Sequence, residues 1–260
     1  THCAIINGMM EYKKLNESAE LPFYSIIPLG TGNNIAKSFL LSRDEGFFSS
    51  ELRRTITGTV YGAVFKVDLG KVNGKYFLDA FTTGIDAHIL TGRNKDRLSL
   101  LKYPILNRIL MGYPLYVLNT IKSFGKCRHL VCKVEADGNI FHDGGLFNVI
   151  VNNTRIYAGE LDPTDNAMAN DGFLDLAIYT GRRDYLKSYL LGYRGISRKL
   201  RDCFLLKKKM SHHIKIEKAE IKFDQKVVAQ IDGEEMEASD AYKISVIPEA
   251  ISMKIPVEPA

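Results

Sequence analysis

The pattern of hydrophobic and polar residues changes near Tyr61. Upstream it is mainly helical, with a helical run at residues 35–40 and one apolar run at residues 23–27 that predicts a strand. From residue 65 onward, short alternating apolar runs are separated by turn dipeptides, which is the pattern of an antiparallel sandwich or barrel. The 260 residues are 45% hydrophobic, enough to bury a large core. We therefore predict two units, residues 1–60 and residues 61–260.

Three dipeptides predict two-residue hairpin turns, because Asn-Gly and Asp-Gly accept the positive φ that both central positions of such turns require. Asn-Gly at 73–74 joins the runs 65–71 and 75–82, Asp-Gly at 137–138 joins 130–135 and 140–152, and Asp-Gly at 232–233 joins 227–231 and 234–238. Further strands are predicted at residues 173–180, 213–223, 243–247 and 252–257.

Two helical inserts interrupt the predicted strands. The first covers residues 95–124, is broken by Pro104 and Pro114, and carries apolar residues on most faces. The second begins at Asp184 as its N-cap and continues with apolar residues at three- and four-residue spacings. The longest charge-free part of the first insert, residues 109–121, is too short to span a bilayer. We see no transmembrane helix, secretory signal or cysteine pair, and expect a cytoplasmic protein with reduced thiols.

Basic residues are concentrated in one segment. Residues 182–209 contain ten Lys and Arg against two Asp, whereas the net charge of the whole chain is only +5. This asymmetry favours contact with an anionic partner, whether a membrane surface, a nucleic acid or an acidic protein. The alternative is a solvated helix end, which suits the negative pole of the helix dipole.

Residues 28–34, with the sequence PLGTGNN, predict a phosphate-binding loop. Two glycines and small polar side chains lie between an apolar run and a helix start, so backbone N–H groups can face an anion at the positive end of the helix dipole. The loop is neither a P-loop nor a Rossmann fingerprint, because it lacks Gly-Lys-Ser/Thr and the third glycine. An ordinary tight turn is the alternative on local grounds.

Two short acidic motifs carry further candidate chemistry. Asp232 and Glu234 lie two residues apart across a rigid turn, where one carboxylate could accept a proton from a substrate hydroxyl. Asp171, with nearby main-chain carbonyls, offers the oxygen ligands that Mg²⁺ or Ca²⁺ prefers. An ordinary turn is the alternative for both motifs.

Taken together, these motifs resemble the catalytic domain shared by soluble bacterial diacylglycerol kinases, related lipid kinases and sphingosine kinases. Residues 28–34 are similar to the family's Pro-Leu-Gly-Thr-Gly-Asn-Asp, with Asn34 in place of the final Asp, and Thr1 stands where its Gly-Gly-Asp-Gly-Thr motif ends. Similar segments follow in the family's order at residues 67–70, 81–87, 151–153 with 157–159, and 170–176. The resemblance implies an α/β plus all-β fold. Residues 1–60 would be the end of an α/β nucleotide-binding domain, and residues 61–260 an antiparallel β-sandwich domain with helical inserts.

The resemblance also implies an ATP-dependent lipid kinase that transfers the γ-phosphoryl group to a hydroxyl of a lipid such as diacylglycerol. Asp232 and Glu234 would be the catalytic carboxylates, with Glu234 favoured as the base and the division of roles left open. The implied nucleotide-binding residues are Thr1, Gly30, Thr31, Gly32, Asn33 and Asn34. The implied ligands of a structural Mg²⁺ are Asp171 and carbonyls such as those of Met168 and Phe173.

The implied partners are the lipid substrate and an anionic membrane surface met from the cytoplasm, with no nucleic acid, and a homodimer is left open. The chain departs from the family at Cys3 and Ala4, where Asn and Glu are common, and residues 159–163 are poorer in glycine. Two alternative functions follow, a kinase of a soluble substrate similar to NAD kinases and a non-catalytic lipid- or nucleotide-binding module. The apolar inserts and the motif at 28–34 favour the lipid kinase.

Overall fold

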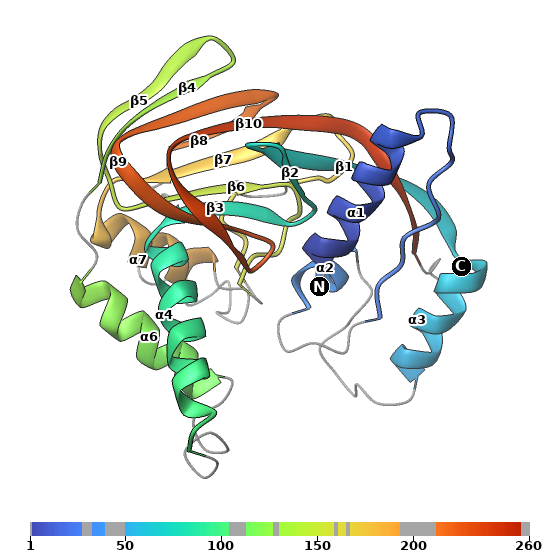
Figure 1. The fold of residues 1–260 in the computed structure, drawn as a ribbon, viewed down its shortest axis with the longest axis horizontal. Helices are drawn as coiled ribbons and strands as arrows, with labels where there is room; N and C mark the ends of the chain where they lie inside the picture. Colours follow the sequence, from blue (N-terminus) through green and yellow to red (C-terminus); the bar gives the residue numbers. More distant parts are fainter. Residues whose placement is uncertain are drawn as a thin grey trace.

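The computed structural model describes residues 2–27, 33–39, 50–103, 113–126, 130–158, 161–164, 167–192 and 212–255. Over these residues the molecule is built mainly from antiparallel strands, with helices on one side of the sheet and at one end of it (Figure 1). None of the described helices combines the length and the apolar character needed to cross a membrane.

The helices are α1 (His2–Leu15), α2 (Asn34–Ser38), α3 (Ser50–Tyr61), α4 (Ile85–Leu100), α6 (Tyr113–Lys126) and α7 (Arg182–Gly192). The first strands are β1 (Ala63–Val72), β2 (Lys75–Phe77), β3 (Ala80–Gly84), β4 (Leu130–Ala136) and β5 (Asn139–Leu146). The remaining strands are β6 (Asn148–Asn152), β7 (Leu174–Tyr179), β8 (His212–Ile216), β9 (Lys218–Ile231) and β10 (Glu234–Ile255).

The strands form one sheet in the order β2-β1-β10-β9-β3-β6-β7-β8, and the β4–β5 hairpin joins it by pairing β4 with β9. Side chains from strands far apart in this order, such as β4 and β7, share one hydrophobic cluster that includes the fully buried Phe77, Phe81 and Tyr242. Burial of this apolar surface is the main force that holds the sheet together. The predicted antiparallel strands are therefore confirmed, whereas their arrangement as a sandwich and the division into two domains at residue 61 stay predictions.

All three predicted hairpins are present. The turn residues Asn73, Asp137 and Asp232 have φ between 46° and 49°, and the glycines that follow them have φ between 79° and 87°. Positive φ at both central positions defines the type I′ turn, whose twist matches that of the flanking strands. These turns connect β1 to β2, β4 to β5 and β9 to β10.

Several strand boundaries differ from the prediction. The runs predicted at 234–238 and 243–247, and the run predicted at 252–257 as far as residue 255, belong to the single strand β10, which has register shifts against β9 and β1. The run predicted at 213–223 is divided between β8 and β9 at Glu217, where the Asp137 carboxylate accepts hydrogen bonds from the N–H groups of Glu217 and Lys218. The run at 23–27 forms only an isolated bridge between Tyr24 and Met253 instead of a strand.

Both predicted helical inserts begin at the wrong residue. The first helix, α4, begins at Ile85 and not at Lys95, because Gly84, with φ of 102°, turns the end of β3 directly into a helix. The second, α7, begins at Arg182, so Asp184 lies in its first turn and accepts a hydrogen bond from the Thr180 hydroxyl instead of acting as the N-cap. Most of the basic segment at 182–209 lies outside the described residues.

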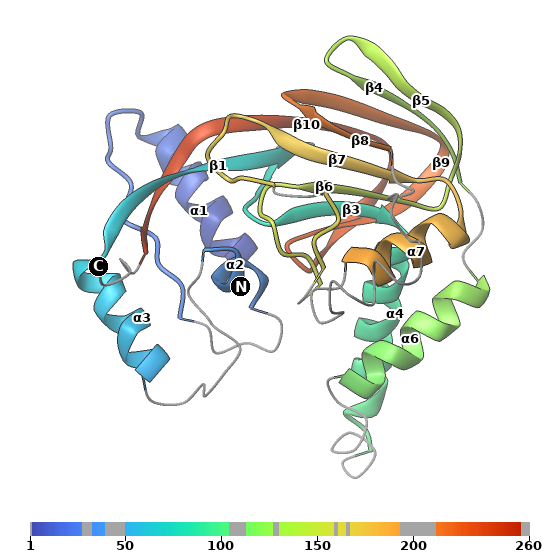
Figure 2. The same ribbon diagram turned by 180° about the vertical axis from the view of Figure 1, so that it is seen from behind.

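The helices fall into two groups. Helices α4, α6 and α7 lie beneath β3, β6 and β7, while α1, α2 and α3 lie at the other end of the sheet, near β1 and β10 (Figures 1 and 2). Two further hydrophobic clusters correspond to these groups. Leu78 belongs to the cluster with α1 and α2, and Ala80 belongs to the cluster with α4 and α7. The short link from β2 to β3 therefore passes between the two groups and places Asp79 at their junction.

Candidate active site

The side chain of Asp232 is anchored to the link between β2 and β3. Its Oδ2 accepts a hydrogen bond from the N–H of Leu78 at 2.8 Å, and its Oδ1 accepts from the N–H groups of Asp79 at 2.8 Å and Ala80 at 3.1 Å. In return the N–H of Asp232 donates to the carbonyl of Ala80 at 2.9 Å. The turn between β9 and β10 is thus fixed against residues 78–80.

Asp79 is the second carboxylate at this position. Its Oδ1 accepts a hydrogen bond from the Thr154 hydroxyl at 2.5 Å, and its Oδ2 accepts from the Asn34 side-chain amide at 3.0 Å. Its carbonyl accepts hydrogen bonds from the N–H groups of Asn153 and Thr154. Asp79 therefore connects the sheet to Asn34, which is the first residue of α2 and the last residue of the predicted phosphate-binding loop.

The two carboxyl groups have raised pKa values. Burial raises the pKa of Asp232 to about 6, although its three backbone N–H partners act in the opposite direction. Burial raises the pKa of Asp79 to about 7, and the neighbouring charge of Asp232 raises it further. The site thus concentrates negative charge in a poorly solvated position, an arrangement that favours a cation or a proton.

A pocket of about 190 Å³ opens beside these carboxylates. Asn34, Asp79 and Asp232 line it together with Leu90 and Arg93 of α4 and Tyr116 of α6. The remaining lining residues are Ala80, Asp86, Tyr157, Ala158, Gln230 and Gly233. The pocket, hereafter the acidic pocket, is therefore shared by α2, the link between β2 and β3, the turn from β9 to β10, and the helices α4 and α6.

The inner wall of the acidic pocket is built around Asp86 in the first turn of α4. Its carboxylate accepts hydrogen bonds from the Tyr185 hydroxyl at 2.6 Å, the Asn148 amide at 2.7 Å and the Tyr157 hydroxyl at 3.1 Å. Burial raises the pKa of Asp86, and these three donors oppose that effect. Burial and the charge of Asp86 raise the pKa of both tyrosines well above their usual value, so they stay donors.

Of the site residues predicted from sequence, the structure brings two into the acidic pocket, while others lie outside it or outside the described residues. Asn34 and Asp232, about two hundred residues apart in sequence, line the same pocket. Glu234 is exposed at the first position of β10, and Asn33 precedes α2 with φ of 47°. Thr1, Gly30, Thr31 and Gly32 lie outside the described residues.

Cys3, one of the positions at which the chain departs from the family, lies in α1 near these carboxylates. Burial raises the pKa of its thiol, and the charges of Asp232 and Glu234 raise it further. The thiol therefore stays protonated and is a poor nucleophile or metal ligand at neutral pH.

Two important residues, Asp79 and Asp86, are missing from the site predicted by sequence. Asp79 lies inside the apolar run 77–81, where a lone carboxylate is unusual, because burying a charge without partners is costly. The same signal applies to Asp86 between Ile85 and Ala87. An acidic residue inside a buried apolar run is thus the feature that would have identified both.

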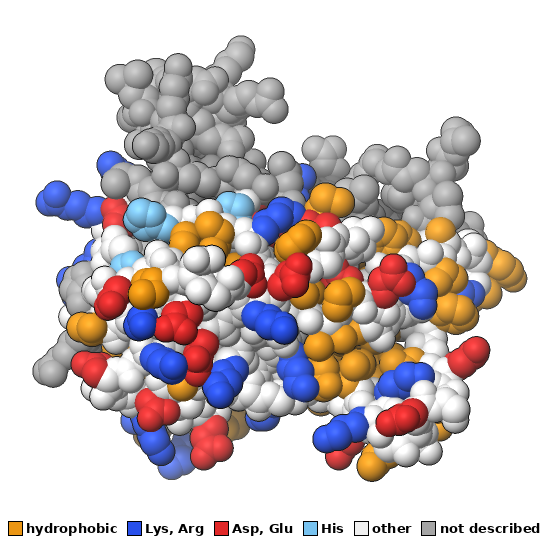
Figure 3. Space-filling model, turned by 90° about the horizontal axis from the view of Figure 1, so that it is seen from above, with side chains coloured by type: hydrophobic (Ala, Val, Ile, Leu, Met, Phe, Trp, Pro, Cys, Tyr) orange, Lys and Arg blue, Asp and Glu red, His pale blue; other side chains and the backbone are white. Residues whose placement is uncertain are grey.

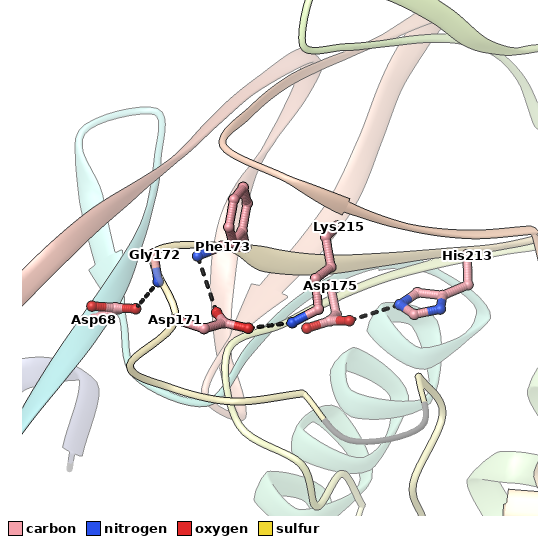
Figure 4. A network of polar contacts seen from close by, with 7 residues as sticks. All are labelled: Asp68, Asp171, Gly172, Phe173, Asp175, His213 and Lys215. Carbon is pink, nitrogen blue, oxygen red and sulfur yellow. Dashed lines mark hydrogen bonds and ion pairs between the residues drawn. The ribbon is translucent and has the colours of Figure 1, made fainter.

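The predicted metal site at Asp171 has a different arrangement. Asp171 Oδ1 accepts a hydrogen bond from the N–H of Phe173 at 3.1 Å, and its Oδ2 contacts the Lys215 ammonium group (Figure 4). Met168 has an exposed side chain. In the described part of the chain, His, Cys, Asp and Glu do not gather in groups of three or more that could hold a metal ion. As arranged, this turn fits a lysine better than a divalent cation.

Comparisons with known proteins were made for both sequence and structure. No protein-family profile matches the chain. A "Probable lipid kinase YegS-like" protein of Pectobacterium atrosepticum is 23% identical over 256 residues, which are 96% of this chain and 75% of that protein. The diacylglycerol kinase of Bacillus subtilis is 22% identical over 217 residues, which are 82% of this chain and 63% of that protein. The chain thus spans between 63% and 75% of the lengths of these two relatives.

The fold has solved counterparts. A crystal structure from Bacillus anthracis, described as that of a candidate diacylglycerol kinase, matches 96% of this chain and 72% of its own with a TM-score of 0.67 at 19% identity. A second diacylglycerol kinase structure from the same organism matches 94% of this chain and 71% of its own with a TM-score of 0.59 at 16% identity. The fold is therefore that of bacterial diacylglycerol kinases. Together with the sequence matches, it confirms the resemblance of this chain to the diacylglycerol kinase catalytic-domain family.

Proposed function

We propose that the protein is a lipid kinase that transfers the γ-phosphoryl group of ATP to a hydroxyl of a lipid such as diacylglycerol. The observation that carries the proposal is the acidic pocket, which Asn34 from the predicted phosphate-binding loop lines together with residues of the helices α4 and α6. Two carboxylates, Asp79 and Asp232, line the same pocket. The names of the relatives, lipid kinase and diacylglycerol kinase, support the same class of reaction.

The residues of the pocket fit Mg²⁺ bound to ATP. Mg²⁺ in kinases is commonly held by one or two carboxylates together with substrate phosphates and water. Asp79 and Asp232 are such a pair; burial raises the pKa of both, and a cation bound beside them would stabilise their charged forms. When bound, the ion would neutralise charge on the transferred phosphoryl group.

In this mechanism the protein contributes mainly position and charge. Asp232, held by three N–H groups, fixes the turn that carries Glu234. Glu234, exposed at the start of β10, accepts the proton of the lipid hydroxyl in our proposal. Asn34 and the preceding loop hold the nucleotide phosphates through N–H groups and the side-chain amide.

The acceptor lipid would enter from the side of α4 and α6. Leu90, Arg93 and Tyr116 line that side of the acidic pocket, so an apolar chain and a polar headgroup can both find partners there. Further out, exposed apolar side chains continue along the two helices, namely Leu98 on α4 and Val117, Leu118 and Ile121 on α6. Exposed apolar side chains that gather along neighbouring helices, unlike singly scattered ones, are typical of a surface that binds a lipid, a membrane or a protein.

We also propose that the enzyme acts at the cytoplasmic surface of an anionic membrane. The local excess of positive charge at residues 182–209 supports this. On the face seen in Figure 3, the described positive and negative side chains are interspersed, so this face presents no patch of a single sign. If binding to vesicles depended neither on anionic lipid nor on salt, this proposal would fall.

The decisive experiment is a phosphorylation assay with labelled ATP, Mg²⁺ and a panel of acceptors, using the full-length protein. We expect label in a lipid alcohol, and its loss in Asp232→Asn and Glu234→Gln. Because Glu234 is exposed, Glu234→Gln should lose activity without losing thermal stability. Lys133→Met, on an exposed ion pair of the sheet, is the matched control and should stay active. Label in NAD instead of any lipid would favour a soluble-substrate kinase, and ligand binding without turnover would favour a non-catalytic module.

A further inference from the structure

The turn at residues 170–173 is held by a lysine from a neighbouring strand. Lys215 lies on β8 opposite Asp175 on β7, and its ammonium group reaches back to Asp171 Oδ2 (Figure 4). The other oxygen of Asp171 accepts the N–H of Phe173. Both oxygens of the carboxylate that was expected to bind a metal therefore already have a hydrogen-bond donor.

Lys215 serves a second carboxylate as well. Asp175 is buried and pairs through Oδ1 with His213 Nε2 at 2.7 Å, while its Oδ2 has no hydrogen-bond donor among the described residues. Because Asp175 is the cross-strand partner of Lys215, the ammonium group that contacts Asp171 also lies beside Asp175. A single positive charge thus faces two acidic side chains, Asp171 just before β7 and Asp175 within it.

A divalent ion at this turn would have to compete with that ammonium group. Mg²⁺ requires six ligands and Ca²⁺ six to eight, largely oxygens. The expected ligand set contains one carboxylate, that of Asp171, and main-chain carbonyls. A cation bound to Asp171 would lie close to the Lys215 ammonium group. Like charges in such proximity repel strongly when they are partly removed from water.

We propose that the Lys215 ammonium group is a built-in counterion that takes the place of the structural divalent cation expected at Asp171, so that this turn folds independently of Mg²⁺ and Ca²⁺. The proposal concerns the architecture of this chain and does not depend on which substrate is phosphorylated. It makes Lys215 a positioning residue.

The turn matters because hydrogen bonds between side chains and backbone connect it to the acidic pocket. Asp68 on β1 accepts hydrogen bonds from the N–H groups of Gly172 at 2.8 Å and Glu249 at 2.7 Å, and its own N–H donates to Ala169. The side-chain amide of Asn153 donates to the carbonyls of both Asp68 and Leu78 at 2.8 Å. The N–H of Leu78 donates a hydrogen bond to the Asp232 carboxylate. A less ordered turn at residues 170–173 should therefore also make the Asp232 side chain in the pocket less ordered.

The test compares thermal unfolding of the full-length protein in EDTA and in Mg²⁺ or Ca²⁺, without nucleotide. Wild type and Lys215→Arg should unfold at the same temperature in all three conditions. Lys215→Met should lose about 2–4 °C in EDTA and regain it in a divalent cation, because the vacated Asp171 can then bind one. Lys133→Met removes an ion pair of similar exposure that is not at a turn, and should show no response to cations.

Calorimetric titration of Mg²⁺ without nucleotide provides the second readout, and Asp171→Asn assigns any heat to this turn. In wild type the heat should not change when Asp171 is replaced. Three results would overturn the proposal: Mg²⁺ binding in wild type that Asp171→Asn abolishes, a Lys215→Met variant as stable as Lys133→Met, or a destabilised Lys215→Met variant that no divalent cation restores. None of these readouts measures phosphorylation, so failure here is distinct from failure of the proposed kinase activity.

Discussion

Replacing Asp79 with asparagine should stabilise the protein at neutral and basic pH. In the folded state its pKa rises from 3.8 to about 7, because the group is buried next to Asp232. Each pKa unit corresponds to about 1.4 kcal/mol, so ionising Asp79 in the folded protein costs on the order of 4 kcal/mol. Asparagine removes this cost and fits the same contacts, since its oxygen can accept from Asn34 and its amide can donate to the Thr154 hydroxyl.

The sign of the pH dependence follows from proton binding. Between pH 3.8 and about 7 the folded protein holds a proton on Asp79 that the unfolded chain has released, so stability falls as pH rises through this window. The advantage of Asp79→Asn should therefore grow by roughly 2–3 kcal/mol between pH 5 and pH 8 and then level off. Urea unfolding at intermediate pH values measures it, with the exposed Asp224→Asn as control. If Asp79→Asn raised the free energy of unfolding by the same amount at every pH, ionisation of Asp79 would not be the source of the destabilisation.

Three further substitutions test the surroundings of the pocket by urea unfolding. Tyr185→Phe removes a donor from the buried Asp86 carboxylate and should cost about 1.5–3 kcal/mol, whereas Tyr12→Phe on the surface should be neutral. Gly84→Ala should lower the free energy of unfolding more than Gly138→Ala does, although both glycines have positive φ. Only at residue 84 would a Cβ lie 2.5 Å from the carbonyl oxygen of Phe147. Equal losses of stability would mean that φ alone matters. Asn153→Ala removes two hydrogen bonds to buried carbonyls and should lower the free energy of unfolding by at least about 2 kcal/mol and reduce kinase activity. An active and stable variant would disprove the coupling between the Asp171 turn and the acidic pocket.

The hairpins could be predicted from sequence because their cause is local. A type I′ turn needs positive φ at two adjacent residues. Asn-Gly and Asp-Gly adopt this conformation readily, so the dipeptide predicts the turn whatever the rest of the chain does. The continuity of β10 could not be predicted in the same way. It depends on β1 and β9, which pair with different parts of the same strand and absorb its irregularities as register shifts.

The candidate site was predictable only in part, for a related reason. Asp232 belongs to a motif, and its turn was visible in the sequence. Asp79 belongs to no turn or motif, and its importance comes from Leu78 and Ala80 being buried in two different clusters. The contact of Lys215 with Asp171 joins residues 44 positions apart and depends on the pairing of β7 with β8. Such relations exist only once the sheet is formed.

The position of β9 has a consequence for how the molecule can move. This strand pairs with β10, β3 and β4, so its backbone cannot open without breaking hydrogen bonds to several neighbours at once. Amides near its end at Ile231 should therefore be among the slowest to exchange with solvent. The turn that follows β9, which carries Asp232, is therefore the rigid part of the site. Closure around a substrate is then expected from the other elements that line the pocket, among them α2, α4 and α6.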